Sequence, residues 1–225
     1  MRGFLTIDLL NLILINIMAY SDFSLSSVKK AFQLKLIEQS DFFKESPELK
    51  PSALLQEILK DNLPLALASN TEKSRSEMII APILIDLRKQ FANHISIFSG
   101  ISFTVDPAQG LDGNCNFLIS YSEELLLLTT PIITLVEAKK EDLNAGLGQC
   151  IAEMIAAQRF NEREENQIAE IYGTVTSGTV WKFLKLNQNN VFIDLTEYYL
   201  GNLPKILGIL ATGINAVKSQ LSPVK

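Results

Sequence analysis

Cysteine and histidine are scarce in this sequence, with two cysteines and one histidine among 225 residues. Cys115 and Cys150 stand far apart and no CxxC pair occurs, so neither a zinc ribbon nor a disulfide framework is indicated. A reducing compartment follows as the default, and we expect the protein to be cytoplasmic. His94 has no cysteine or serine arrangement around it that is typical of nucleophilic catalysis, so we interpret it as a loop residue.

Positive charge is also in short supply. The chain has 20 Lys and Arg residues against 25 Asp and Glu residues, for a formal net charge of −5. General affinity for nucleic acids comes largely from Lys and Arg that replace counterions on phosphates. The composition therefore argues against a protein that coats nucleic acid, although it leaves room for a local basic groove.

The apolar run from Phe4 to Ile17 is too short for a membrane span. It is interrupted by Asp8, Asn11 and other polar residues, and a membrane-spanning helix needs about 20 apolar residues. We interpret residues 1–17 as an N-terminal extension or a misassigned start, with Met18 opening the functional chain. The alternatives are an amphipathic, membrane-associated helix and a signal peptide. Membrane association is not expected.

What is present is the composition of one globular domain, 47% hydrophobic and 20% charged. Apolar spacing predicts helices over 24–32 and 52–60, within a helical N-terminal layer over 18–70. A longer helix is predicted over 72–91, where Pro82 kinks it or marks its true start. A closing amphipathic helix is predicted over 203–221, within a C-terminal segment over 201–225.

Between these helices the pattern is that of strands. Strands are predicted over 95–105, 115–121 and 131–138, then a helix over 142–161, then strands over 169–176 and 179–186 and an edge strand over 191–195. A crossover helix between the third and fourth strands predicts that these two pair in parallel within a mixed sheet. The fold class is therefore α/β, with its core over residues 71–200.

Glu137 and Lys139 end the most continuously apolar strand of the chain. Because they are two positions apart on a strand, their side chains leave the same face. A carboxylate can hold Mg²⁺ there, while the neighbouring ammonium orients or activates a water and offsets charge on a phosphate. Glu48 and Lys50 repeat the spacing in a polar stretch, so the strand context makes the difference.

Glu137-Ala138-Lys139, together with the element order over residues 72–186, resembles the PD-(D/E)xK, or restriction-endonuclease-like, superfamily. The core of that superfamily runs helix, three strands, helix, strand. Three further stretches, at 71–77, 146–154 and 172–179, are similar to a group of cyanobacterial proteins of this kind. In that group the position of Asn116 is usually Asp.

The resemblance implies a role for five residues. Glu77 is the first-helix acid of the metal shell, and Asn116 stands at the position of the first metal-binding Asp. Glu137 and Lys139 are the Glu and Lys of the ExK element, and Gln149 is a polar residue near the scissile phosphate. The implied cofactor is Mg²⁺, with Mn²⁺ as a substitute. The implied partner is nucleic acid, with DNA favoured, and many members act as homodimers.

Other interpretations of these residues stay open. A neutral amide is a weaker partner for Mg²⁺ than a carboxylate, so Asn116 puts activity in doubt rather than fold. Asn116 is equally well explained as a buried amide that bonds backbone, and Asp112 is an alternative ligand. Glu137 and Lys139 can form a plain strand-end ion pair, Glu77 can be exposed, and Gln149 can simply line its helix.

The sequence therefore supports two main hypotheses. The first is a Mg²⁺-dependent nuclease that hydrolyses DNA phosphodiester bonds. The second is a catalytically impaired relative that binds nucleic acid or a partner protein and keeps Glu137 and Lys139 for binding or structure. A third, weaker hypothesis is a protein tethered to a membrane by residues 1–17.

Overall fold

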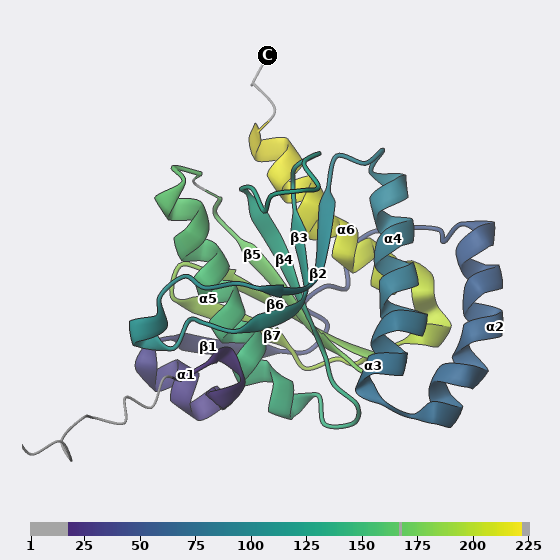
Figure 1. The fold of residues 1–225 in the computed structure, drawn as a ribbon, viewed down its shortest axis with the longest axis horizontal. Helices are drawn as coiled ribbons and strands as arrows, with labels where there is room; N and C mark the ends of the chain where they lie inside the picture. The colour runs from purple at the N-terminus through teal and green to yellow at the C-terminus, as the bar shows by residue number, and fades with distance from the viewer. Residues whose placement is uncertain (1–17, 167, 222–225) are drawn as a thin grey trace, which may run out of the picture.

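The computed structural model describes residues 18–166 and 168–221. The expectations for residues 1–17 lie outside this part of the chain. The described residues form one mixed eight-stranded sheet with helices on both faces (Figure 1). The predicted α/β class is confirmed.

The main path of the sheet runs in the order β1, β7, β6, β5, β4, β3, β2, with β8 paired to β6. The strands are β1 (Lys35–Gln39), β2 (Ser96–Ser102), β3 (Asn114–Ser120), β4 (Ile132–Ala138), β5 (Ile171–Thr176), β6 (Val180–Asn187), β7 (Asn190–Asp194) and β8 (Tyr198–Tyr199). Strand β4 lies inside the sheet, antiparallel to β3 and parallel to β5. The predicted parallel pair is therefore confirmed, with Glu137 opposite Val175.

Helices form a layer on each side of the sheet (Figure 1). Helices α1 (Leu25–Ala31) and α5 (Leu147–Arg163) pack on one face and share an apolar core with it. Helices α2 (Ala53–Ser69), α4 (Ala81–Gln90) and α6 (Leu203–Leu221) pack on the other. Short helical turns complete the described chain: η2 (Tyr20–Asp22), α3 (Glu72–Arg75), η3 (Ser76–Ile80), η4 (Pro107–Gln109), η5 (Asn144–Gly146) and η6 (Leu200–Asn202).

Helix α6 is part of the apolar core. With its preceding turn, Leu200–Leu221 is the one helix of the described chain that is long and apolar enough to cross a bilayer. Its best window has a mean hydropathy of 1.2, and 56% of that window is buried. Ile206, Leu207 and Ile214 are fully buried. The helix is therefore weak evidence for a membrane span and is explained by packing on the sheet.

The long helix predicted over 72–91 is continuous but contains a π-helical turn, η3, directly before Pro82. Proline has no backbone N–H, so it cannot bond the carbonyl of Met78, one turn earlier. The side-chain amide of Asn62 on α2 donates to that carbonyl instead, at 3.0 Å. Pro82, which is expected to kink the helix or to mark its true start, lies in the first turn of α4, after the π-helical turn.

Two predictions about the N-terminal layer and the sheet edge are wrong. The stretch over 18–70 is not purely helical, because it contains β1, which pairs in parallel with β7. Consequently the strand predicted as an edge over 191–195 lies inside the sheet, between β1 and β6. Strand β1 has only five, mostly exposed residues. Such a strand forms because it pairs with another strand of the fold, and its sequence shows little alternation of apolar and polar residues.

Candidate functional site

Glu137 and Lys139 lie at the carboxyl end of β4, on the face covered by α5. The Glu137 side chain is buried, with 1% of its surface exposed, and its Oε1 is 2.7 Å from Lys139 Nζ. The backbone N–H of Lys139 donates to the carbonyl of Thr176 at 2.8 Å, so strand pairing continues past Ala138. The buried strand thereby fixes both side chains on one face, as their spacing predicts.

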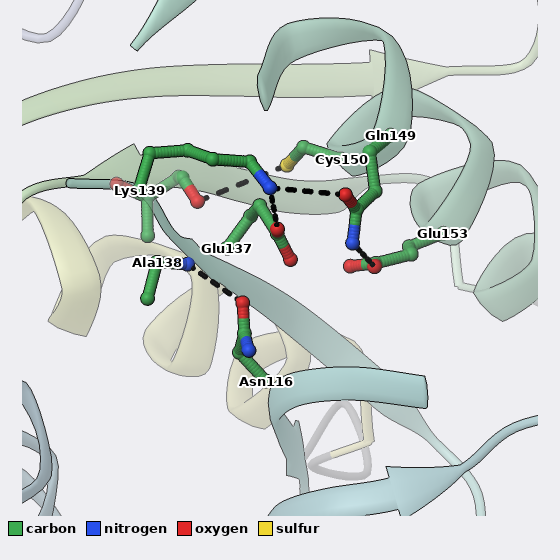
Figure 2. A network of polar contacts seen from close by, with 8 residues as sticks. Asn116, Glu137, Ala138, Lys139, Gln149, Cys150 and Glu153 are labelled. Atoms are coloured by element: carbon green, nitrogen blue, oxygen red, sulfur yellow. Dashed lines mark hydrogen bonds and ion pairs between the residues drawn. The ribbon is translucent and has the colours of Figure 1, made fainter. Parts of the chain in front are cut away.

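Helix α5 contributes two more polar side chains, Gln149 and Glu153, one turn apart. Lys139 Nζ donates to Gln149 Oε1 at 3.2 Å, and Gln149 Nε2 donates to Glu153 Oε1 at 3.1 Å. Figure 2 shows the resulting chain of contacts, with the carboxyl groups of Glu137 and Glu153 pointing toward one another. The sheet and the helix therefore bring two acids, one ammonium and one amide together.

Each of the two glutamates has a polar partner for only one of its two carboxyl oxygens. Glu153 is fully buried, and Glu137 nearly so. The second oxygen of each, Oε2, is buried and has no hydrogen-bond partner among the described residues. Buried polar atoms are normally bonded, and a buried carboxylate without compensation is costly. Two such oxygens in one site are therefore a feature that the fold itself does not explain.

The acid–base properties of the site follow from this burial. Burial raises the pKa of Glu137 to about 7, although the hydrogen bond and charge of Lys139 oppose the shift. Burial, and then repulsion from Glu137, raises the pKa of Glu153 well above its ordinary range. For Lys139 burial lowers the pKa, but the hydrogen bond and charge of Glu137 outweigh it, so the net pKa is raised. The ammonium is therefore retained at neutral pH.

Asn116 lies on β3 at the edge of this site. Its Oδ1 accepts the backbone N–H of Ala138 at 2.9 Å, so the amide bridges β3 to the end of β4 (Figure 2). This contact agrees with the interpretation of Asn116 as an amide that bonds backbone. A carboxylate at this position could accept the same N–H and keep a charged oxygen for a metal, whereas the amide oxygen has one remaining lone pair and no charge.

Two acids, Glu72 and Glu77, lie at the start of the helix predicted over 72–91. Glu77 has a side chain that is 61% exposed, and it pairs with Lys73 at 3.4 Å one turn away. The charge of Glu72, by contrast, contributes to the raised pKa values of both Glu137 and Lys139. Glu72 therefore adds to the negative charge around Glu137.

Asp112, the alternative ligand, is engaged elsewhere. Its Oδ1 accepts the hydroxyl of Thr104, and its backbone carbonyl accepts the N–H of Tyr20 at 2.9 Å. These contacts hold the turn before β3 against η2. Nothing in them directs the Asp112 carboxylate toward Glu137.

A second lysine lies on the same face of the sheet. Lys182 on β6 is opposite Val175, which is itself opposite Glu137, so the three are in register across neighbouring strands. Lys182 is 8% exposed, and its Nζ donates to Asn144 Oδ1 at 3.1 Å. Among the described residues no carboxylate pairs with it. In a chain of negative net charge, this ammonium adds positive potential near the site.

The turn before α5 packs between the two lysines. A Cβ added to Gly146 would lie 2.7 Å from Val175 Cγ1 and 3.0 Å from Lys139 Cγ. Only glycine therefore allows this turn to approach the sheet so closely. Gly146 thus packs closely on the sheet, whereas Gly148 approaches the carbonyl of Phe23.

Sequence reasoning missed Glu153 and Lys182. Glu153 had a signal, because it is a charged residue among Cys150, Ile151 and Met154 on a helix that is otherwise apolar at that level. A charge inside a buried helical stretch is unusual unless it is paired or functional. Lys182 gave a weaker signal, because lysine is common at strand positions that face solvent.

The side-chain atoms of this site that could bind a metal ion are oxygens. Among the described residues no group of three or more His, Cys, Asp or Glu side chains is arranged to hold a metal. The potential ligands of the site are two carboxylates and one amide.

A scan against protein-family models found no match to the chain, and a search of curated proteins gave no significant match either.

Proposed function

We propose that this chain is a divalent-metal-dependent phosphodiesterase that hydrolyses nucleic acid, with DNA as the favoured substrate and a restriction-endonuclease-like core. The observation that carries the proposal is the buried Glu137, with one oxygen paired to Lys139 and the other unpartnered, at the carboxyl end of an internal parallel strand. Ligand sites of α/β sheets commonly lie at such strand ends. The element order over 72–186 supports the same proposal.

The residues present fit a hard divalent cation. Mg²⁺ prefers oxygen ligands, usually one or two carboxylates with waters and substrate phosphate oxygens completing the shell. Glu137 Oε2 is free of protein partners among the described residues, and Asn116 Oδ1 has a remaining lone pair. When bound, such an ion supplies Lewis-acid stabilisation of the phosphate and acidifies an attacking water. Mn²⁺ offers the same chemistry with the same ligands.

Lys139 is held in place by Glu137 and Gln149 and can contact a water or a phosphate oxygen. Two N–H groups of Lys139 are engaged by Glu137 and Gln149, which holds the ammonium in one position and leaves its third N–H for a water or a phosphate oxygen. Its side chain is 24% exposed, so this group is where the site meets solvent. In the hydrolysis a water loses a proton as its oxygen bonds to phosphorus, one P–O ester bond breaks, and the leaving oxygen takes up a proton.

A second candidate function is a nuclease-like module that binds nucleic acid or a partner protein without cutting. The specific observation in its favour is Asn116, whose oxygen is already used by the Ala138 N–H and carries no charge. In that case Glu137 and Lys139 serve binding alone. A cytoplasmic location and action as a homodimer are part of the first proposal.

A plasmid-nicking assay with Mg²⁺ or Mn²⁺, and with EDTA as the blank, separates the two functions. We expect metal-dependent nicking by the parent, loss of nicking in Lys139→Ala, and no change in Lys140→Ala. Lys140 is the matched control because it is adjacent and its side chain is 47% exposed. Absence of nicking by the parent, together with nicking by Asn116→Asp, would favour the binding module.

A further inference from the structure

The strongest unexplained feature of the molecule is the carboxyl group of Glu153. It is contributed by α5, it is 0% exposed, and its Oε1 is held by Gln149 while its Oε2 has no partner among the described residues. A buried charge in a helix interior is strongly destabilising unless it is compensated. Leucine or glutamine at this position would cost less, so packing alone does not explain a glutamate.

The position of the unpartnered oxygens indicates what compensates them. Glu137 and Glu153 approach one another from opposite elements, one from β4 and the other from α5 (Figure 2). Lys139 contacts the first directly but reaches the second only through Gln149. With both glutamates ionised, as a bound cation would hold them, two carboxylates and one ammonium leave a net negative site. The acceptors that remain are oxygen atoms, which is the donor type that a hard divalent cation selects.

We infer that Glu153 is the second carboxylate ligand of a divalent cation held between it and Glu137, in place of the acid that is missing at Asn116. This inference deepens the proposed function, because it assigns the metal ligands of that same site. The charge that an Asp on β3 would bring is supplied from α5 instead. Asn116 then contributes the bond to Ala138 that fixes the end of β4.

Gln149 acquires a role as a positioning residue. Its amide bonds Lys139 on one side and Glu153 on the other, so it keeps the ammonium and the second carboxylate in fixed relation. Outer contacts of this kind orient ligands at metal sites and set their affinity.

Helix α5 offers a matched control for Glu153. Gln158 Nε2 donates to Glu162 Oε1 at 3.0 Å, the same pairing one turn apart that links Gln149 to Glu153. Glu162 is exposed, whereas Glu153 is buried. Glu153→Gln and Glu162→Gln therefore make the same chemical change to the same kind of helical pair, inside and outside the site.

The test is Mn²⁺ binding to the full chain, measured by calorimetry and by the loss of the free-ion signal in electron paramagnetic resonance. We expect the parent and Glu162→Gln to bind one ion alike, and Glu153→Gln to bind at least about tenfold more weakly. Glu137→Gln is expected to lose as much. Circular dichroism and thermal unfolding of each variant check that the fold is kept.

Two results would overturn the assignment. One is no Mn²⁺ binding by the parent, and the other is unchanged affinity in a folded Glu153→Gln protein. Failure of the proposed function looks different, because the parent then binds Mn²⁺ through both glutamates but nicks no plasmid. Nicking by a parent whose Mn²⁺ affinity is insensitive to Glu153 would instead keep the function and remove this ligand.

Discussion

Two of the buried acidic centres among the described residues are treated in opposite ways by the fold. At the end of β7, Asp194 is fully buried, and both of its oxygens are bonded. Its Oδ1 accepts the N–H of Thr196 at 2.9 Å, and its Oδ2 accepts the hydroxyl of Tyr198 at 2.8 Å and the N–H of Phe43 at 3.2 Å. At the end of β4, Glu137 and Glu153 each leave one oxygen without a partner among the described residues.

We interpret this difference as that between an acid that serves the fold and a pair of acids that serves the proposed site. Asp194 joins β7, the loop to β8 and the segment around Phe43, so its charge is compensated within the fold. The pair of glutamates is compensated in part, by one lysine and one glutamine. Proteins retain such incomplete satisfaction at sites whose remaining partner comes from outside.

The largest expected effect is on Asp194. Asp194→Ala leaves the Thr196 and Phe43 N–H groups and the Tyr198 hydroxyl without their acceptor, and each unsatisfied buried group costs roughly 1–3 kcal/mol. We expect the free energy of unfolding to fall by about 3 kcal/mol or more in urea titrations. Asp41→Asn is the control, because Asp41 is exposed, its side chain accepts only the Thr196 hydroxyl, and asparagine tolerates the positive φ of 58° at this position. A loss no larger than that of the control would remove Asp194 as a structural acid.

The second effect is on the pH dependence of stability. The pKa of Glu137 is raised in the folded state to about 7, so the folded protein keeps a proton that the unfolded chain releases above about 4.3. Without divalent metal, stability should therefore be greatest below the unfolded pKa. It should fall as pH rises toward about 7, by at most about 1.4 kcal/mol per pH unit for each such carboxyl.

Chemical unfolding between pH 4.5 and 7.5 in the presence of EDTA measures this slope. Glu137 faces Lys139, Glu72 and Glu153, and the raised pKa of Glu153 acts in the same direction. The difference between the parent and Glu137→Gln isolates the contribution of the site from that of other acids. A stability difference that is constant across this range would contradict the raised pKa.

The third prediction concerns Glu153→Gln, which should raise the free energy of unfolding by less than Asp194→Ala lowers it. Glu153→Gln replaces a buried carboxyl by a neutral amide of the same shape and keeps an acceptor for Gln149. At pH 8 without metal, we expect the variant to be more stable than the parent by about 1–2 kcal/mol, because the cost of burying the charge is removed. If it were as destabilising as Asp194→Ala, the two centres would not differ as described.

The smallest effect is expected at Glu77. Its side chain is exposed, and its pair with Lys73 is of the kind that contributes at most a few tenths of a kcal/mol. Glu77→Ala should leave both Mn²⁺ affinity and unfolding within experimental error of the parent. A clear loss of Mn²⁺ affinity would restore Glu77 as a ligand and weaken the case for Glu153.

The sequence predicts the core of this fold well because its signals are local. The continuously apolar stretch of β4, the turn at Ser177-Gly178 and the helical spacing of α5 and α6 each appear in neighbouring residues. Strand β1 could not be predicted in this way, since its five residues gain strand structure from pairing with β7 about 150 positions later. The topology of the edge depends on that contact.

The site was predictable in part for the same reason. The spacing of Glu137 and Lys139 fixes their common face, and one turn of α5 separates Gln149 from Glu153. Whether Glu72 or Glu77 lies nearer to Glu137 depends on how α3 packs against the sheet. The sequence does not reveal that packing. The burial of Glu153 also arises only when α5 docks on β4 and β5.

The most direct test of the central claim is a crystal structure of the protein with Mn²⁺, with the ion located by its anomalous scattering. We expect one peak between Glu137 Oε2 and Glu153 Oε2, with the Asn116 bond to Ala138 unchanged. A peak elsewhere, with the two carboxyl groups bonded only to protein atoms or to each other, would show that this buried pair is not a metal site.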